Sequence, residues 1–357
     1  MKKDVRILVV GAGPTGLTAA LELARRGIIA KIVERRREPS GLSRAVGILP
    51  SSLEVLKPSG VSAALRAEGI MIEAGNFHYG KRRIATIPFR SKTDPELGIL
   101  ALAQDRTEAH LKAAFEKLGG EISYGQSVTA LNQTDDSVRV EYAGGGTEKF
   151  DHVIGADGID SVVRSEIGLP YEGFDEPDKW SIADVECPDW TYPRQAAFFL
   201  MDQGNIAIVI PLEAERYRVI SNTQNALRDL PVPIHVTEIH REGVFTVSVR
   251  QVPRYDVGRV FLAGDAAHCH SPVGGRGMNL GISDAARLAH DLTVGRSQDY
   301  SAVRHAEGAR AIRDSERPRK ALTSPNPVAR WAAVGGLRLV GRLGFLQTRF
   351  LRVLTDS

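Results

Sequence analysis

The sequence predicts a fold of the α/β class (α+β), with a parallel sheet flanked by helices, a second, mixed sheet, and helices at the C-terminal end. Three observations support this prediction. Near the N-terminus, and again near residue 260, a short apolar run precedes a glycine-rich turn and an Ala- and Leu-rich segment. This order is typical of a strand followed by a helix. Between residues 171 and 256, several alternating or apolar runs follow one another, which indicates antiparallel or mixed strands.

Length and composition limit the kinds of protein that the chain can be. A chain of 357 residues suits about two domains. Its formal net charge of +3 gives no global attraction to a polyanion, so no nucleic acid is expected as a partner. The two cysteines, Cys187 and Cys269, are too few for a disulfide framework, and we expect free thiols. Because no stretch is typical of a signal peptide or a membrane span, we expect a cytoplasmic protein.

The first motif lies at the N-terminal end. A strand is expected at residues 6–10, followed by the turn Gly11-Ala12-Gly13-Pro14-Thr15-Gly16 and a helix. Pro14 suits a first helical turn, because its missing N–H would have no partner there. A second strand at residues 30–33 ends at Glu34, about 20 residues further on, where an acidic residue can bind a ribose hydroxyl. The pattern predicts dinucleotide binding, and the alternative is a purely structural turn between strand and helix.

The central part alternates between a helix and short strands. A helix is expected to open at Asp105, with Glu108 completing a capping box. Apolar runs separated by turn residues predict strands at residues 128–131, 137–142, 148–151 and 152–154. The last of these strands delivers a second glycine-containing turn, Gly155-Ala156-Asp157-Gly158.

The most informative segment is GDAAHCHSPVGGRGMNLGISDA, at residues 264–285. It follows a short apolar strand and leads into a helix. Asp265 is placed to accept a hydrogen bond from a ribitol or ribose hydroxyl. Gly274, Gly275 and Gly277 allow backbone N–H groups to approach a ligand closely. The segment therefore predicts a cofactor site that suits a diphosphate and an anionic ring.

Taken together, these motifs resemble the single-component FAD-dependent aromatic hydroxylases, monooxygenases of the para-hydroxybenzoate hydroxylase type. Three segments carry the resemblance, at 11–16, 155–164 and 264–285, with Ser43-Arg44 and Gln104-Asp105-Arg106 between them. The resemblance covers most of residues 5–290. It implies a discontinuous, Rossmann-like FAD-binding domain of the glutathione-reductase type, a substrate-binding sheet domain and a C-terminal helical segment. The expected boundaries are 1–74, 98–170 and 256–300 for the first, 75–97 and 171–255 for the second, and 301–357 for the third.

The resemblance also assigns residues to parts of FAD. It implies that the glycines of the first turn hold the diphosphate, that Glu34 binds the adenosine ribose and that Asp265 binds the ribityl chain. Arg44 and Gln104 would contact the diphosphate and ribityl region, and Asp157-Gly158 corresponds to the family's segment that is associated with both FAD and the nicotinamide donor. The full cofactor-binding set implied is Gly11, Gly13, Pro14, Thr15, Gly16, Glu34, Arg35, Arg44, Gln104, Arg106, Val128, Asp157, Gly158, Gly264, Asp265, Pro272, Gly274, Gly275, Gly277, Met278 and Asn279.

The resemblance implies that residues 272–279 pass under the isoalloxazine ring, so we call residues 264–285 the ring segment and its glycine-rich part at 272–277 the ring loop. Two details of the ring segment stay open at this point. Arg276 stands where relatives often have glutamine, so its charge either stabilises reduced flavin or faces solvent. His268 and His270 are a candidate ligand pair, but their place inside a flavin segment disfavours a metal, and we expect none.

The resemblance implies a monooxygenase that uses NADH or NADPH and O2. Its reduced flavin would form a C4a-hydroperoxide that hydroxylates an aromatic or polyketide-like small molecule. Two other classes stay open, an FAD-dependent halogenase or double-bond reductase, and a non-enzymatic flavoprotein. The halogenase signature W-x-W-x-I-P is missing, because Trp180, Trp190 and Trp331 stand isolated.

The substrate pocket is expected on the mixed sheet, which the segment at residues 75–89 joins. Apolar residues there either line the pocket or form sheet core: Phe198, Phe199, Ile208, Ile210 and Pro211. Candidates for assisting phenol deprotonation are His78, Tyr79 and Tyr217. We assign no catalytic base.

The tail from Pro325 to Ser357 is basic and partly apolar. We expect it to pack against the FAD-binding domain with its arginines in solvent. The alternatives are contact with an anionic membrane or with another subunit. The protein itself is expected to be a monomer or a homodimer.

Overall fold

The computed structural model describes residues 5–39, 45–90, 97–272 and 274–355. In this part of the chain, six strands form the first large sheet, in the order β18-β19-β12-β1-β2-β8. They are β1 (Ile7–Val10), β2 (Lys31–Glu34), β8 (Ile122–Tyr124), β12 (His152–Gly155), β18 (Asp256–Val257) and β19 (Val260–Leu262). All pairs are parallel except β18 with β19. The four residues of β1 are all buried, as expected of a parallel strand covered on both faces.

Helices α1 (Pro14–Ala24), α4 (Gln104–Lys117) and α6 (Gly277–Val294) accompany this sheet, and α1 contacts the other two. The prediction that α4 opens with a capping box at Asp105 was wrong. The helix begins at Gln104 after Ala103, which offers no side-chain cap. Instead, Gln104 Nε2 donates to Glu108 Oε1 at 2.8 Å, so the two side chains bond to each other along the first turn.

Small residues set the closest approach of α1 to α6. A Cβ atom added at Gly281 would lie 2.2 Å from Thr15 Oγ1 and 3.3 Å from the Cα of Gly264. Gly264 itself has a φ of +62°, and a Cβ there would lie 2.5 Å from the same hydroxyl oxygen. The ring segment and the first glycine turn are therefore packed directly against each other.

Smaller elements complete this half of the molecule. One small sheet lies near α2 and α3, and an antiparallel sheet follows β8, with its strands at the predicted places. The elements are β3 (Gly47–Ile48), α2 (Pro50–Leu56), η1 (Lys57–Ser59), α3 (Val61–Glu68), β4 (Ile70–Met71), β7 (Leu100–Ala101), β9 (Val128–Gln133), β10 (Val138–Tyr142), β11 (Thr147–Phe150), α5 (Val162–Glu166), η3 (Gly264–Ala266) and η4 (Ser297–Asp299).

The second large sheet has eight strands among the described residues, in the order β20-β17-β13-β16-β15-β14-β5-β6. They are β5 (Ala74–Tyr79), β6 (Arg82–Pro88), β13 (Glu172–Glu186), β14 (Ala196–Leu200), β15 (Ile206–Glu213), β16 (Arg216–Ser221), β17 (Glu238–Gln251) and β20 (His268–Cys269), with the turn η2 (Asp202–Gly204). The mixed sheet and the membership of β5 and β6 were predicted. The long strand β13 was missed, because its first half is charged and exposed and shows no alternation.

The two faces of this sheet pack against different parts of the chain. On the face that carries Phe77, the rings of Phe77 and Phe198 stack with centroids 4.7 Å apart, in one core with residues from 46–49 and 99–103. We call this the Phe77 face. The opposite face carries His78 and packs against the segment from 187 to 236. A fully buried ion pair between Arg218 and Asp184, with both N···O distances 2.7 Å, lies on the Phe77 side, since Arg218 is opposite Ile210.

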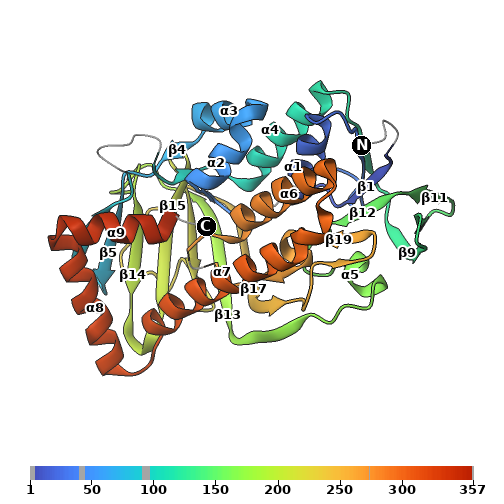
Figure 1. Cartoon of the computed structure of the whole chain (residues 1–357). Helices are drawn as coiled ribbons and strands as arrows, with labels where there is room; N and C mark the ends of the chain where they lie inside the picture. The colour runs from blue at the N-terminus through green and yellow to red at the C-terminus, as the bar shows by residue number, and fades with distance from the viewer. Residues whose placement is uncertain (1–4, 40–44, 91–96, 273, 356–357) are drawn as a thin grey trace.

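The C-terminal helices are α7 (Tyr300–Leu322), α8 (Pro327–Arg342) and α9 (Gly344–Thr355). In Figure 1 the parallel sheet lies at the right and the larger sheet at the left, and α8 and α9 lie at the left edge. The expectation that the tail packs against the FAD-binding domain was wrong in the main. α8 and α9 pack on β6, and Leu337 and Phe350 join the core of the Phe77 face. Apolar residues on one side of each helix find there the nearest uncovered sheet surface.

No helix among the described residues combines the length and the apolar character that crossing a bilayer requires.

The α1–α6 packing generates the first prediction. We expect Gly281→Ala to lower the free energy of unfolding by about 1–3 kcal/mol, because overpacking forces the helices apart. Gly336→Ala on α8 is the matched control: an added Cβ there meets no atom within 4 Å, so the change should stabilise by about 0.5–1 kcal/mol. Urea unfolding of both variants measures the difference, and equal stabilities would show that the close contact is not limiting.

Candidate functional site

The three glycines of the first turn have different physical roles. Gly11 has a φ of +104°, and a Cβ there would lie 2.3 Å from the carbonyl oxygen of Ala156. A Cβ at Gly16 would lie 1.9 Å from the carbonyl oxygen of Gly11. Gly13, in contrast, has no atom within 4 Å of an added Cβ. Gly11 and Gly16 are thus required by packing, whereas Gly13 leaves the N-terminus of α1 open to a ligand, which is the arrangement that diphosphates bind.

Glu34 ends β2 beside this turn. Its Oε2 accepts from the Ala12 N–H at 2.9 Å, and its Oε1 accepts from the backbone N–H and the Nε of Arg36, each at 3.0 Å. Burial raises the pKa of Glu34, but the hydrogen bonds from Arg36 and Ala12 outweigh it and bring the pKa below its ordinary value. The neighbouring Arg35 is exposed, so Arg36 rather than Arg35 is the arginine at this carboxylate.

The adenosine end predicted near Glu34 is built from two segments. The Gly125 N–H donates to the Arg36 carbonyl at 2.7 Å, and the Gln126 N–H donates to the Glu34 carbonyl at 2.9 Å. Val128 follows directly, buried at the start of β9. The structure therefore brings Val128 and Glu34, which are far apart in the sequence, to the same end of the site.

The turn after β12 is held by its own carboxylate. Asp157 Oδ1 accepts from Ser161 Oγ at 2.5 Å, and Oδ2 accepts from the Val163 N–H at 3.1 Å. Gly158 has a φ of +84° with open space around it. Asp157 thus orders the turn and the start of α5, beside Gly11.

Arg164, which the sequence analysis did not single out as a site residue, connects this turn to the ring segment. Its guanidinium donates to the carbonyls of Ile159 at 2.7 Å and Ala266 at 3.1 Å, and it lies 4.0 Å from the ring centroid of Tyr171. The Tyr171 hydroxyl in turn donates to the Asp265 carbonyl at 2.8 Å. The backbone on both sides of Asp265 is therefore fixed, while its side chain is exposed.

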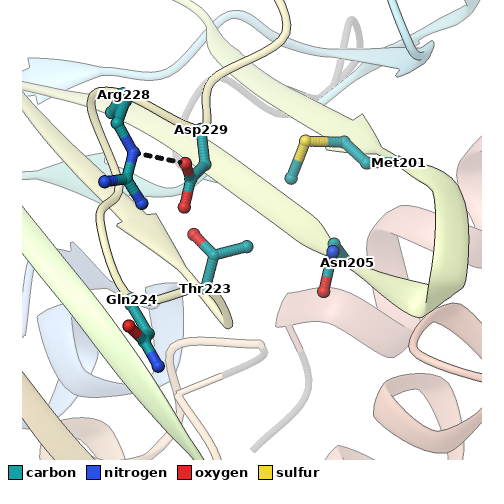
Figure 2. A pocket seen from close by; sticks show the side chains of 6 residues that line it. All are labelled: Met201, Asn205, Thr223, Gln224, Arg228 and Asp229. Atoms are coloured by element: carbon teal, nitrogen blue, oxygen red, sulfur yellow. Dashed lines mark hydrogen bonds and ion pairs between the residues drawn. The ribbon is translucent and has the colours of Figure 1, made fainter.

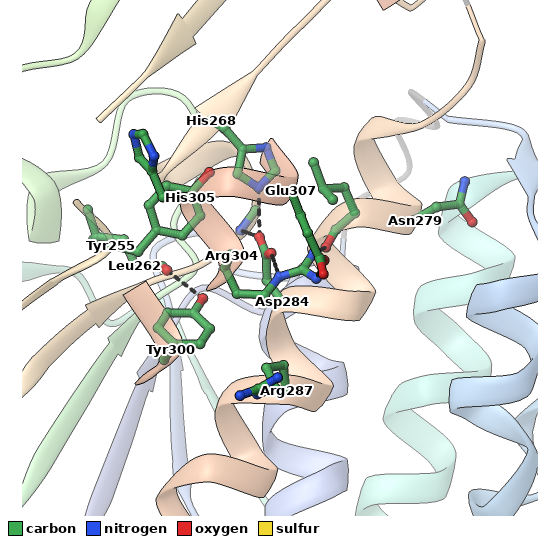
Figure 3. Close-up of polar contacts among 12 residues, drawn as sticks. Tyr255, Leu262, His268, Asn279, Asp284, Arg287, Tyr300, Arg304, His305 and Glu307 are labelled. Carbon is green, nitrogen blue, oxygen red and sulfur yellow. Dashed lines mark hydrogen bonds and ion pairs between the residues drawn. The ribbon is translucent and has the colours of Figure 1, made fainter. Parts of the chain in front are cut away.

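A buried carboxylate supports the ring segment from behind. Asp284 on α6 accepts from the Gly264 N–H at 3.0 Å and from Arg304 Nε at 2.6 Å, and His268 Nε2 lies 2.6 Å from it (Figure 3). Burial raises the pKa of Asp284, but Arg304 and His268 lower it to a net value below the ordinary one. His268 is therefore a partner of Asp284. Asp284 was missed from sequence, although an acidic residue on an otherwise buried helix face was a signal for it.

The N-terminus of α6 is anchored by Asn279. Its Oδ1 accepts from the Leu49 N–H at 2.8 Å, and its Nδ2 donates to the carbonyls of Gly47 at 2.9 Å and Gly275 at 2.8 Å. Met278 is also buried, Gly277 is half-buried, and Pro272, Gly274 and Gly275 are exposed. The loop before α6 thus presents its backbone outward, with Gly274 and Gly275 both at positive φ.

Arg276 is the one residue of this loop whose role the sequence left open. Of the two alternatives, the one in which Arg276 faces solvent was wrong, since only 7% of it is exposed. Its Nη2 donates to the Val353 carbonyl on α9, and its Nη1 lies 3.6 Å from Asp314 Oδ2 on α7. Arg276 joins the ring loop to the C-terminal helices.

The remaining predicted cofactor-binding residues are Gln104, Arg106 and Arg44, of which Gln104 and Arg106 do not form one cluster among the described residues. Gln104 Oε1 accepts from the Ala45 N–H at 3.0 Å, next to Arg44, which lies outside the described residues. Arg106 forms an exposed ion pair with Glu68 on α3. The structure thus places Gln104 beside Ala45 and pairs Arg106 with a residue of a different helix.

The candidates for a catalytic base do not converge. His78 and Tyr217 are buried on the His78 face, where His78 Nε2 lies 3.2 Å from the Tyr192 hydroxyl. Burial lowers the pKa of His78. Tyr79 is exposed and donates to Asp202 at 3.2 Å. Because successive side chains alternate across a strand, His78 points away from the Phe77 face.

One cavity of about 370 Å³ lies elsewhere, beside η2 and the loop after β16 (Figure 2). Its lining is polar and includes Asn205, Thr223 and the neighbouring pair Arg228 and Asp229. None of its lining residues belongs to the three segments that form the cofactor strip. This strip runs from Glu34 past Gly13 to Gly264 and Asp265, and it suits a long ligand with a diphosphate in its middle.

Comparison with known proteins identifies the family of the chain that carries this strip. The model of the FAD binding domain family matches residues 4–226 and 219–299. Rifampicin monooxygenase of Streptomyces venezuelae is 31% identical over 351 residues, which cover 90% of this chain and 72% of that protein. Pentachlorophenol 4-monooxygenase of Sphingobium chlorophenolicum is 32% identical over 314 residues, which cover 82% of this chain and 58% of that protein.

A solved structure agrees on the fold. The p-nitrophenol 4-monooxygenase PnpA of Pseudomonas putida DLL-E4 superimposes with a TM-score of 0.89 over 99% of both chains, at 23% sequence identity. The arrangement of sheets and C-terminal helices is therefore shared over the whole described chain.

Gly13 generates a prediction that separates binding from folding. We expect Gly13→Ala to leave the stability of the FAD-free protein within about 0.5 kcal/mol of the original, since the new Cβ meets no protein atom. FAD affinity should fall at least about tenfold, because the methyl group occupies the space through which a diphosphate approaches. Gly16→Ala is the control, for which the FAD-free protein itself should be destabilised. Flavin titration and thermal unfolding measure both quantities, and unchanged affinity in Gly13→Ala would contradict the assignment.

His270 generates a prediction about acid stability. Burial lowers its pKa to about 4, below the ordinary value of an unfolded chain. His270 therefore leaves the free energy of unfolding unchanged above about pH 6.5 and lowers it as pH falls toward 4, by up to about 3 kcal/mol. In His270→Gln this loss should be absent, so denaturant unfolding at several pH values should show a flatter profile for the variant. Parallel profiles would contradict the prediction.

Proposed function

The chain belongs to the FAD binding domain family of flavin-dependent monooxygenases, and on this premise we propose that it hydroxylates an aromatic or polyketide-like small molecule, using O2 and NADH or NADPH. The observation that carries the proposal is the cofactor strip. The open backbone at Gly13, the carboxylate of Glu34 and the exposed side chain of Asp265 lie on connected segments. A ligand with a nucleotide at one end and a hydroxylated chain at the other matches them.

The residues present fit FAD in both charge and shape. The positive end of α1 faces the position of a diphosphate at Gly13, and that of α6 lies at the exposed loop before Gly277. Such helix ends favour anions, which suits a diphosphate and an anionic reduced ring. Asp265 is proposed to accept from a ribityl hydroxyl and Glu34 from a ribose hydroxyl. When bound, FAD supplies the redox chemistry and the activation of O2.

The chain's own contribution is to orient the substrate and keep water out. Phe77, Phe198 and Ile210 lie together on the Phe77 face, next to the residues at 46–49. We propose that this apolar surface binds the substrate ring. Water exclusion matters because activated oxygen that meets water is lost as hydrogen peroxide. The names of the two relatives refer to rifampicin and to pentachlorophenol, and the second name favours phenol-like substrates here as well.

No side chain is proposed as catalytic base. His78 and Tyr217 lie on the face opposite the Phe77 face, and Tyr79 is exposed at the end of β5, where its hydroxyl donates to Asp202. The phenol proton is therefore proposed to leave to solvent or to a group other than these three. The missing W-x-W-x-I-P signature disfavours a halogenase, and the family relatives named as monooxygenases disfavour a flavoprotein without activity.

The decisive test is a substrate screen with the purified, FAD-loaded protein. We expect phenolic compounds to increase NADH or NADPH consumption at least about tenfold and the product to gain one oxygen atom from labelled O2, measured by mass spectrometry. A protein that binds no FAD would overturn the proposal entirely. A product that forms only with halide, or one without added oxygen, would support the alternative enzyme classes instead.

Asp265 provides a residue-level test of the same proposal. Asp265→Ala should retain the fold but lose bound FAD during gel filtration, because one hydrogen bond to a charged acceptor contributes about 1.5–3 kcal/mol. Asp265→Asn should retain flavin better, since the amide oxygen still accepts a hydrogen bond. Equal flavin retention in all three proteins would remove the role given to this carboxylate.

A further inference from the structure

Helices α8 and α9 each have an apolar side that the fold does not use. Side chains on the inner side, such as Val334 and Leu351, are buried against the core near β6. On the other side, Trp331 is 76% exposed and Phe345 is 70% exposed, with Val328, Leu339 and Val353 also exposed. On α8, the positions 328, 331, 335, 339 and 342 follow the spacing of one helix face. We call the exposed sides of α8 and α9 together the tail face.

The charge of the tail face has a single sign. Between Asn326 and Thr355 the sequence contains five arginines and no aspartate, glutamate or lysine. Four of these arginines are exposed among the apolar side chains: Arg338, Arg342, Arg349 and Arg352. The hairpin between β5 and β6, on which α8 packs, adds the exposed Lys81, Arg82 and Arg83. Aromatic and cationic side chains therefore alternate along α8 and α9, and residues 326–355 contain no acid that would compensate the charge.

We propose that the tail face binds the surface of an anionic lipid bilayer, with α8 and α9 lying in the interface. Exposed Trp and Phe side chains insert at the level of the headgroups, while arginines extend toward lipid phosphates. Anionic lipids attract such clusters of basic residues. A second copy of the chain is a poorer occupant, because two tail faces would bring together eight exposed arginines, and α8 and α9 carry no acid among their described residues to compensate them. The proposal does not depend on the hydroxylation chemistry.

This docking would place the cofactor loop close to the lipid surface. Arg276 of the ring loop donates to the carbonyl of Val353 on α9, whose side chain belongs to the tail face. Apolar substrates dissolved in the bilayer would thus be presented near the loop.

The test uses the FAD-loaded protein and vesicles. Trp180 and Trp190 are buried, at 2% and 8% exposed, so Trp331 dominates any change in tryptophan emission. Vesicles of phosphatidylcholine with about 30% phosphatidylglycerol should shift the emission to the blue and sediment the protein at least about tenfold more strongly than pure phosphatidylcholine. Raising the salt concentration should reverse the binding, because the attraction is screened.

Variants make the assignment specific. Arg338→Glu with Arg342→Glu should weaken binding at least about tenfold, and Trp331→Ser with Phe345→Ser should abolish it. The matched control combines Arg139→Glu on β10 with Val244→Ser on β17, two exposed positions outside the tail face, and should bind like the original protein. Thermal unfolding and flavin content confirm that each variant is folded. Absence of sedimentation with anionic vesicles, or equal binding by all variants, would overturn the proposal. So would a vesicle-independent dimer that Trp331→Ser dissociates, which would make the occupant a second copy.

Discussion

The buried carboxylate of Asp284 is the interaction on which the cofactor side of the molecule depends. It receives donors from η3, from α7 and from the region of β20, and these elements are far apart in the sequence. Removing one partner of a buried charge typically costs about 3–5 kcal/mol, because the other charge is left uncompensated. Asp284 holds Gly264 at the position where it meets Thr15 and Gly281. The position of Gly264 between α1 and α6 therefore depends on this one group.

The cofactor strip was predictable from sequence because its requirements are local. The turn at residues 11–16 needs glycine at positions where a Cβ would meet backbone within 2.3 Å, and such steric demands leave a recognisable spacing. Gly264, two residues after the end of β19, is also under a steric demand, because its φ is +62° and an added Cβ would lie 2.5 Å from Thr15 Oγ1. The assignment of each residue to a part of FAD stays a prediction.

The remaining features depend on contacts between distant segments, which spacing does not encode. Strand β13 escaped prediction because its neighbours β16 and β17 on either side, rather than its own pattern, keep it extended. The sequence does not distinguish Arg106 from Arg276, yet Arg106 pairs with Glu68 at the surface and Arg276 is buried under α9. The tail was predicted to pack on the wrong half of the molecule for the same reason. Its sequence shows that one side of each helix is apolar, but not which sheet that side covers.

The hydrogen bond from Arg276 to the Val353 carbonyl couples the conformation of the ring loop to that of the last helix, α9. If a ligand orders the ring loop, thermodynamic reciprocity requires that the same ligand also changes the stability of α9. The amide protons of α9 consequently report on events at the loop, although no residue of that helix belongs to the three glycine-containing segments. Although α9 lies at the edge of the fold, its stability therefore depends on whether the site holds a ligand.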